Sequence, residues 1–284
     1  MNRILAAVDL SPMSRRVADR ARRLAEGHRT KLRLVHVWEQ PDVPLPDDML
    51  ERLYLHRQSQ AEDLLTWINA RARCPVELDV RSGNVGMDLT RMSRRADLLV
   101  TGTSSVDQTR VGPLTTRLAR KSHSSVLSVR RRLNSPYRRA IAAVDLSDSS
   151  ARAVDLALEL ASESEAVTAV VSLPSQDEMI LSEAGVVPEQ LDLVRRKRIS
   201  LLEERLEKFV AGWGGLVRTR VLDGPPAETV AEFARRRNAD LVVLSSRGAA
   251  NSSMVLLGSV AEATMWTVPC DVAIARVPGR FRRP

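Results

Sequence analysis

The sequence predicts an α/β fold of two tandem domains, each a doubly wound, Rossmann-like layer around a five-stranded parallel sheet. The length of 284 residues suits two domains at about 100 to 200 residues each. Residues 6–11, AAVDLS, recur letter for letter at 142–147. Within each copy, short apolar runs alternate with longer helical patterns, which is typical of βαβ units and a parallel sheet.

The repeat extends over the whole chain and defines the domains. Later landmarks recur with a slowly growing offset: Gly83 as Gly224, residues 96–98 as 239–241, and Val126 as Val272. Insertions in the connections of the second copy explain why this offset grows along the chain. We therefore expect a tandem duplication with domains at 1–133 and 138–284, joined by an exposed linker within 130–139, where the RRR and NSP sequences lie.

The elements of each copy follow from these patterns. Apolar runs rich in Val, Ile and Leu predict strands at 3–9, 32–37, 76–80, 98–102 and 126–129, then at 140–145, 167–173, 216–222, 241–246 and 272–277. Polar-apolar periodicity predicts helices at 14–26, 47–73, 85–95 and 113–121, then at 149–162, 188–210, 227–237 and 259–266. Ser11-Pro12 and Ser147-Asp148 are N-cap signals for the first helix of each copy.

Composition narrows the class of protein. Nothing approaches the roughly 18 consecutive apolar residues of a membrane helix, and the first residues lack the pattern of a signal peptide, so we expect a cytoplasmic protein without membrane insertion. Cys74 and Cys270 are far apart and outside any metal-binding spacing, which predicts two small buried side chains and no metal site.

Charge is uneven along the chain. The formal net charge is +8, and residues 1–136 hold 24 Lys or Arg against 15 Asp or Glu. A basic first half favours an anionic partner such as nucleic acid, lipid or acidic protein, although solvated helix faces explain the same count. Aromatic residues are only 3% of the chain, which disfavours nucleic acid because stacking platforms are scarce.

One loop is a candidate phosphate-binding site. A strand runs into Ser245, Arg247 and Gly248, and nine residues later Gly258-Ser259 begins a helix. Glycines let backbone N–H groups approach a phosphate, and a helix N-terminus adds a favourable dipole. The alternative is that these glycines only shape a turn.

The arrangement of these motifs resembles the universal stress protein family. The resemblance rests on a first strand ending in Val-Asp, Gly-Pro-Pro-Ala at 224–227, Ala-Asp-Leu-Val-Val-Leu at 239–244, the Gly-x9-Gly-Ser loop and a closing Pro-Cys-Asp-Val at 269–272. It covers both halves and implies a fold of the adenine nucleotide alpha-hydrolase type. The family's loop pattern is G-x2-G-x9-G-[S/T], and the second copy departs from it only at Ser245.

The resemblance also implies roles for particular residues. Asp145, with Ala143 and Val144, would contact the ribose or adenine, and the Val171 backbone would contact the adenine. The phosphates would lie against Ser245, Arg247, Gly248, Gly258, Ser259 and Val260. The first-copy candidates are Asp9, Val37, Gly102 and Gly112. The expected ligand is ATP, with AMP or ADP as alternatives and Mg²⁺ as a companion ion. Structural alternatives remain: Asp145 as a helix cap and Val171 as core.

The first copy departs further from the pattern. Only six residues separate Ser105 from Gly112, and Pro113 stands where the hydroxyl residue is expected. Proline suits a helix start but has no N–H to offer a phosphate. We therefore expect weak nucleotide binding or none in this copy, or a different anionic ligand.

Other functions fit the residues less well. The Ser-Gly-Gly-x-Asp-Ser loop of the ATP-pyrophosphatase relatives is absent, and none of His28, His36, His56 and His123 has a metal or triad spacing. His36 is expected to be a packed core residue, and nothing asks for a flavin. We expect no enzyme, and at most slow incidental ATP hydrolysis. By resemblance, the two copies form an internal pseudo-dimer through strands 126–129 and 272–277, and a further homodimer is left open.

The function that the sequence favours is a regulatory or sensing role in stress response, with the nucleotide mainly in the second domain. The alternative is a stress protein without nucleotide, whose basic first half binds the anionic partner.

Overall fold

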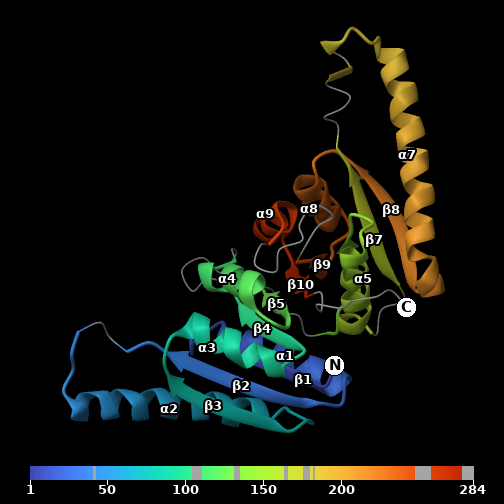
Figure 1. Cartoon of the computed structure of the whole chain (residues 1–284). Coiled ribbons are helices and arrows are strands. Elements are labelled where there is room, and N and C mark those ends of the chain that lie inside the picture. Colours follow the sequence, from blue (N-terminus) through green and yellow to red (C-terminus); the bar gives the residue numbers. More distant parts are fainter. Residues whose placement is uncertain are drawn as a thin grey trace. The chain divides into compact units, whose positions relative to one another are not determined.

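The computed structural model describes residues 1–40, 43–103, 111–130, 135–162, 166–174, 180–181, 183–246 and 257–276. The chain divides into two compact units, Met1–Pro136 and Tyr137–Pro284. Each unit is an α/β layer with helices on both faces of a parallel sheet (Figure 1). This confirms the predicted fold class.

The sheet of the first unit has the order β3-β2-β1-β4-β5. Its strands are β1 (Arg3–Ala7), β2 (Lys31–Trp38), β3 (Val76–Ser82), β4 (Leu98–Gly102) and β5 (Ser125–Val129). All the pairings between them are parallel. The strand order reverses between β1 and β4, and ligands of such sheets bind beyond the carboxyl ends of the strands at this switch point.

Four helices in the described part of the first unit cover this sheet. They are α1 (Ser14–Gly27), α2 (Asp47–Asn69), α3 (Val85–Met92), which continues into a 3-10 turn (Ser93–Arg95), and α4 (Pro113–Lys121). Helices α1 and α2 contact each other and the sheet, and α3 and α4 form a second contacting pair (Figure 1). Between the sheet and α3 and α4 lies an apolar cluster of Leu5, Val35, Val37, Leu89, Leu99, Leu118 and Val126. Removing this apolar surface from water stabilises the unit at roughly 25 cal/mol per Å².

The second unit repeats the plan with the order β10-β9-β6-β7-β8. Its strands are β6 (Ala140–Ala143), β7 (Val167–Leu173), β8 (Val217–Asp223), β9 (Leu241–Ser245) and β10 (Asp271–Ala275), paired in parallel. Its helices are α5 (Asp148–Leu160), α7 (Pro188–Val210), α8 (Pro226–Arg236) and α9 (Ser259–Thr267), with a 3-10 segment at Ala211–Leu216. The switch point lies between β6 and β9.

The repeated Ala-Asp-Leu motif has a structural role in both copies. Asp240 accepts hydrogen bonds from the backbone N–H groups of Arg138 (2.9 Å) and Arg139 (3.0 Å). Asp97 accepts the corresponding bonds from Asn2 (2.6 Å) and Arg3 (3.1 Å). In each sheet, the carboxylate just before the fourth strand therefore holds the backbone at the start of the first strand.

The predicted linker is only partly exposed in its described residues: Arg138 and Arg139 are exposed, and residues 131–134 lie outside the described ranges. Arg130 and Tyr137 are buried, and the Tyr137 hydroxyl donates to Asp271 at 2.7 Å. The prediction missed this because an aromatic ring in a polar stretch finds a partner far away in sequence. Cys270 is buried as predicted, but Cys74 is only half-buried, so that prediction was wrong for Cys74.

One predicted cap is also wrong. Ser147 caps α5, accepting from the Ser150 N–H at 3.3 Å. Helix α1 instead has Met13 at its N-cap without a side-chain cap, because Ser11 begins a turn that precedes the helix. Within the described ranges, no helix is long and apolar enough to cross a membrane.

Candidate functional site

Asp9 and Asp145 occupy the same tight turn at the end of the first strand of each unit. Strands β1 and β6 end two residues before them, at Ala7 and Ala143, although the sequence predicted strands that include both aspartates. The next residues, Leu10 and Leu146, both have φ of 63°. A non-glycine residue there is strained, and such strain gathers at functional sites. Both copies therefore form the same turn after their first strand.

The two carboxylates hold this turn by hydrogen bonds. Asp9 accepts from the Ser11 N–H (3.0 Å) and the Ser14 hydroxyl (2.9 Å). Asp145 accepts from the N–H (3.1 Å) and hydroxyl (2.5 Å) of Ser147. Burial opposes ionisation of Asp9, but the bonds from Ser11 and Ser14 outweigh it and lower its pKa below the ordinary value.

The described site residues of the second unit lie together at the carboxyl ends of the strands. In the sheet register Ala143 pairs with Val170 and with Leu244, so Val171 and Ser245 lie on either side of the end of β6. The Gly258 N–H donates to the Ser246 carbonyl at 3.3 Å, which holds the start of α9 against the end of β9. Arg247 and Gly248 lie outside the described residues.

Helix α9 begins without a side-chain cap. Gly258 is its N-cap, Ser259 is its first residue, and Val260 is 42% exposed. The first N–H groups of a helix have no partner within the helix, so this end presents donors beside β9. An anion is a suitable partner for them.

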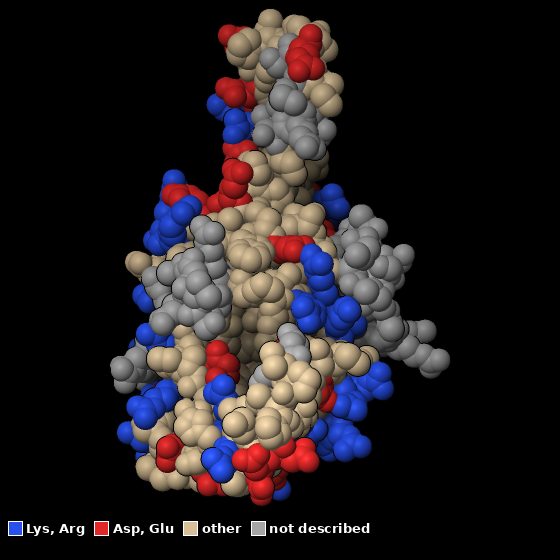
Figure 2. All heavy atoms as spheres, turned by 90° about the vertical axis from the view of Figure 1, so that its left-hand side faces the viewer, with Lys and Arg blue, Asp and Glu red and all other residues tan. Residues whose placement is uncertain are grey.

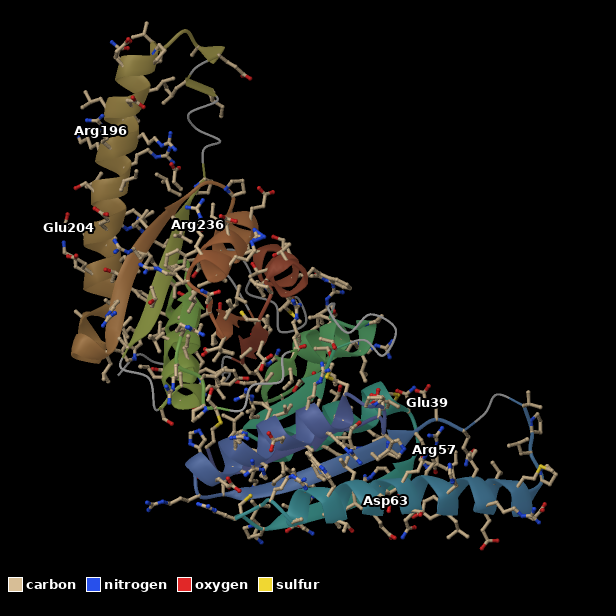
Figure 3. All side chains as sticks on the ribbon, turned by 180° about the vertical axis from the view of Figure 1, so that it is seen from behind. Glu39, Arg57, Asp63, Arg196, Glu204 and Arg236 are labelled. Carbon is tan, nitrogen blue, oxygen red and sulfur yellow. The ribbon has the colours of Figure 1, made fainter. Side chains whose placement is uncertain are left out.

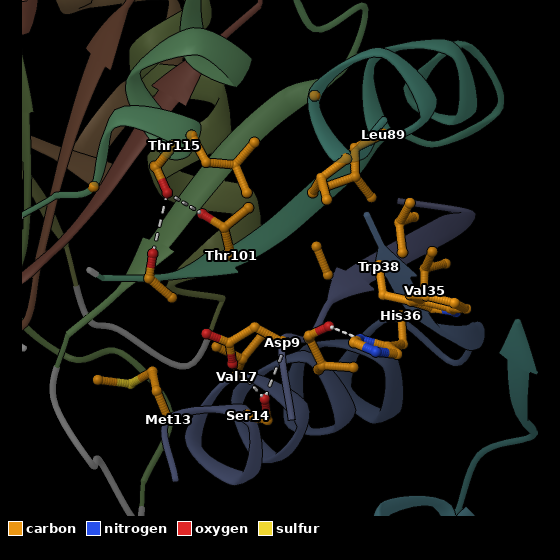
Figure 4. A pocket seen from close by; sticks show the side chains of 18 of the residues that line it. Asp9, Met13, Ser14, Val17, Val35, His36, Trp38, Leu89, Thr101 and Thr115 are labelled. Atoms are coloured by element: carbon orange, nitrogen blue, oxygen red, sulfur yellow. Dashed lines mark hydrogen bonds between the residues drawn. The ribbon is translucent and has the colours of Figure 1, made fainter. Parts of the chain in front are cut away.

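A cavity of about 550 Å³ lies at the carboxyl ends of the strands in the first unit (Figure 4). All four site candidates of this copy line it: Asp9, Val37, Gly102 and Gly112. The remaining lining residues are Ala7, Val8, Met13, Ser14, Val17, Val35, His36, Trp38, Glu39, Arg57, Val85, Gly86, Leu89, Thr101, Thr103, Pro113, Leu114, Thr115 and Arg117. The sequence predicted that this copy has the weaker site of the two.

The start of α4 forms one wall of this cavity. The Thr115 hydroxyl donates to the Gly102 carbonyl and lies near the Thr101 hydroxyl, each at 3.1 Å (Figure 4). Gly112 is the N-cap and Pro113 the first helical residue. The hydroxyl of Thr115 is therefore engaged in joining α4 to β4.

The opposite wall carries buried polar atoms. His36 is 3% exposed, as expected for a core residue, and its Nδ1 lies 2.9 Å from the Val8 carbonyl (Figure 4). Within the described part of the chain, the buried His36 Nε2, Trp38 Nε1 and Arg57 Nε have no hydrogen-bond partner. Burial lowers the pKa of His36, against the bond to Val8, and the charge of Arg57 adds to the lowering.

The pairing of the first and second strands in each unit also shows which residues correspond between the two copies. Ala7 pairs with Val35 as Ala143 pairs with Val170. His36 is therefore the counterpart of Val171, and the sequence candidate Val37 is the counterpart of Ser172. Trp38 corresponds to Leu173, since each carbonyl accepts from a glycine N–H that follows the edge strand, Gly83 at 3.0 Å and Gly224 at 2.9 Å.

Sequence reasoning missed His36, Trp38 and Arg57 as lining residues. A lone histidine in an apolar strand looks like core, and Arg57 lies on a long helix whose facing residues no local pattern reveals. Figure 3 shows Arg57 on the side of α2 that faces the end of β2, near Glu39. In the described portion of the chain, no group of three or more His, Cys, Asp or Glu side chains could hold a metal ion.

Many arginines of the basic first half have acidic partners. Arg22 pairs with Asp19 and Glu26 at 2.8 and 2.7 Å, and Arg33 pairs with Glu77 at 2.8 Å. Arg20 is buried and donates to the Ser135 carbonyl at 3.1 Å. On the face in Figure 2, acidic and basic side chains lie side by side. This pairing weakens the attraction expected from the sequence count.

Comparison with known proteins identifies relatives of both halves. A family described as the universal stress protein family matches residues 1–130 and 136–276. Universal stress protein MJ0531 of Methanocaldococcus jannaschii is 28% identical over 151 residues, which are 50% of this chain and 84% of that protein. Universal stress protein YxiE of Bacillus subtilis is 29% identical over 148 residues, 49% of this chain and 99% of that protein.

A solved structure matches nearly the whole chain. The universal stress protein from Archaeoglobus fulgidus superposes with a TM-score of 0.72 at 16% identity, covering 97% of this chain and 96% of that one. At that identity the likeness concerns the fold alone.

Proposed function

The chain belongs to the universal stress protein family, and from that premise we propose that it has a regulatory or sensing role in which its second unit binds an adenine nucleotide. The proposed ligand is ATP, with Mg²⁺ as its companion ion, and any hydrolysis is slow and incidental. The site comprises Ala143, Val144, Asp145, Val171, Ser245, Gly258, Ser259 and Val260, together with Arg247 and Gly248 of the loop.

One observation carries this proposal. Helix α9 begins uncapped at Gly258-Ser259, beside the end of β9 and next to the switch point with β6. Its first N–H groups and the helix dipole favour a phosphate at this place. The loop spacing of the second copy, Gly248-x9-Gly258-Ser259, supports the same ligand because it matches the family's loop pattern, whose glycines let backbone N–H groups approach a phosphate.

Calorimetric titration of the full chain with Mg-ATP tests the proposal. We expect saturable binding of about one nucleotide per chain. Gly258→Asp should abolish it, since a carboxylate would lie where the phosphates bind. Ser245→Gly should strengthen it by restoring the first glycine of the loop.

Gly212→Asp is the matched control. This glycine is exposed, and a side chain added there would meet nothing within 4 Å. The control should bind ATP like the unmodified chain. Unchanged binding in Gly258→Asp would contradict the assignment.

A further inference from the structure

We infer that the outer face of α7 is an interaction surface for a second copy of this chain, which pairs its own α7 with it in antiparallel about a twofold axis near Ser200. Three features of the helix support this: its extension past the sheet, the exposure of its leucines, and two blocks of opposite charge. The inference does not depend on the nucleotide site proposed above.

The sheet of the second unit buries one end of α7. The buried residues of the helix are Leu206, Phe209 and Val210, all in its last two turns. Near the other end, Arg195 forms an ion pair with Asp223, the last residue of β8. The first turns of α7 therefore extend past the end of β8, where the helix stands clear of the sheet (Figure 1).

The outer face of α7 exposes two leucines. Leu193 is 69% exposed and Leu201 is 52% exposed. They are eight residues apart, so they lie on the same side of the helix. Glu204 belongs to this side, and Figure 3 shows it directed away from β8. Single exposed leucines are common on protein surfaces, so the charges around these two decide what the face can bind.

The charges on this helix form two short blocks of opposite sign. Arg196 and Lys197 make a basic block, and Glu203 and Glu204 make an acidic block seven residues further on. All four side chains are exposed. Seven residues are about 10.5 Å along a helix, which is too far for the i,i+4 pairs that form within one helix. The two blocks therefore do not neutralise each other within one copy.

The blocks are also largely free of other ion pairs. Among the described residues, Arg196, Lys197 and Glu203 have no ion-pair partner. Glu204 pairs with Lys208 at 2.5 Å, four residues along the same helix. Such an exposed pair contributes only about 0.3 to 0.5 kcal/mol, so Glu204 can exchange it for a stronger contact.

An antiparallel pair of α7 helices satisfies both blocks at once. If Ser200 of one copy lies opposite Ser200 of the other, position 196 faces position 204 and position 197 faces position 203. The basic block of each copy then meets the acidic block of the other, and the two contacts are equivalent by symmetry. Leu201 of each copy lies beside the axis, where burial of its apolar surface adds to the attraction.

The charges also select the direction of pairing. In a parallel pair with the same residues opposite each other, the two basic blocks would face each other and so would the two acidic blocks. Charges that flank a helix–helix seam set partner orientation in this way. Because the apolar part of the face is small, we expect a weak, reversible dimer that dissociates as salt screens the charges.

Sedimentation velocity of the full chain tests the inference, over a concentration series up to about 200 μM at low and high salt. At low salt, the average mass should rise with concentration towards twice that of one chain, and at high salt it should fall back. Monomer alone at every concentration would overturn the inference.

Charge exchange tests the direction of the pairing. R196E/K197E and E203K/E204K should each weaken the dimer by about tenfold or more, because like charges then face each other. The variant that carries all four changes is complementary to itself again and should recover the dimer. Loss in both double variants without recovery in the fourfold variant would overturn the antiparallel arrangement.

A matched pair of aspartate variants tests the apolar contact. Leu201→Asp should weaken the dimer by about tenfold, whereas Met87→Asp, at a 73% exposed position on α3, should leave it unchanged. Circular dichroism of each variant checks that it is folded. A dimer that neither Leu201→Asp nor the charge exchanges affect forms through another surface, and this result would refute the role of α7.

Discussion

At the scale of single residues, Asp9 and Asp145 show how a repeated hexapeptide becomes a repeated turn. Each carboxylate accepts an N–H two residues ahead, and each following leucine adopts a positive φ. The sequence predicted that the aspartates end a strand, and the structure places them just beyond it. Alternation of apolar and polar residues cannot reveal a left-handed leucine, because leucine rarely adopts that conformation.

Asp9→Asn should reduce stability in a pH-dependent way. Hydrogen bonds from Ser11 and Ser14 lower the pKa of Asp9, so its charged form stabilises the fold above the unfolded-state pKa of about 4 and loses this effect as the pH falls through the lower folded value. The difference in free energy of unfolding between the unmodified chain and Asp9→Asn should be largest near pH 7 and should shrink as the pH falls below about 4.

Urea unfolding at several pH values measures this difference. Asp63→Asn, an exposed change on α2 (Figure 3), is the control and should leave the pH dependence unchanged. An equal loss of stability at neutral and acid pH for Asp9→Asn would show that the carboxylate charge does not hold the turn.

The cavity residues show the limit of sequence reasoning at this scale. His36 was expected in the core, and its burial confirms that. Its unpaired Nε2 and the neighbouring Arg57 depend on how α2 packs on β2, and no pattern within either segment specifies that packing. By contrast, Asp9, Val37, Gly102 and Gly112 were found by matching copies, and all four line the cavity.

At the scale of elements, periodicity predicted the bounds of the strands and helices to within two residues, apart from the ends of α2 and α3, because apolar runs and helix signals agree. Strands β4 and β7 and helices α4 and α7 match to the residue. The end of α3 differs because the helix gives way to a 3-10 turn at Ser93, whose hydroxyl donates to the Thr90 carbonyl at 2.7 Å.

The serines that precede helices α1 and α5 offer a matched pair of variants. Ser147→Ala removes the cap of α5 and should cost about 1 kcal/mol of stability. Ser11→Ala should cost less, because Ser11 does not cap α1. Chemical denaturation of both variants checks this, and equal losses would mean that the cap of α5 contributes nothing of its own.

The paired aspartates of the fourth strands give a second matched comparison. Asp240 is 5% exposed, so Asp240→Ala leaves two backbone N–H groups near the interior without their acceptor and should destabilise by about 1 to 3 kcal/mol. Asp97 is exposed, and Asp97→Ala should cost less because water replaces the carboxylate. A larger loss for Asp97→Ala in urea unfolding would refute this account.

At the scale of the whole molecule, duplication allowed one copy to depart from the other. The fold class was predictable because the repeat doubled every signal. The proposed difference in nucleotide binding between the copies was harder to predict, since it rests on single exchanges such as Pro113 for Ser259. The packing of the copies through 126–129 and 272–277 stays a prediction.

The most direct measurement of the central claim is hydrogen–deuterium exchange of the full chain with and without Mg-ATP. The account predicts slower exchange at the first amides of α9, Ser259 to Ala261, and little change at the start of α4, Leu114 to Thr116. Protection at α4 without protection at α9, or no protection at either, would contradict the claim that the second unit is the nucleotide site.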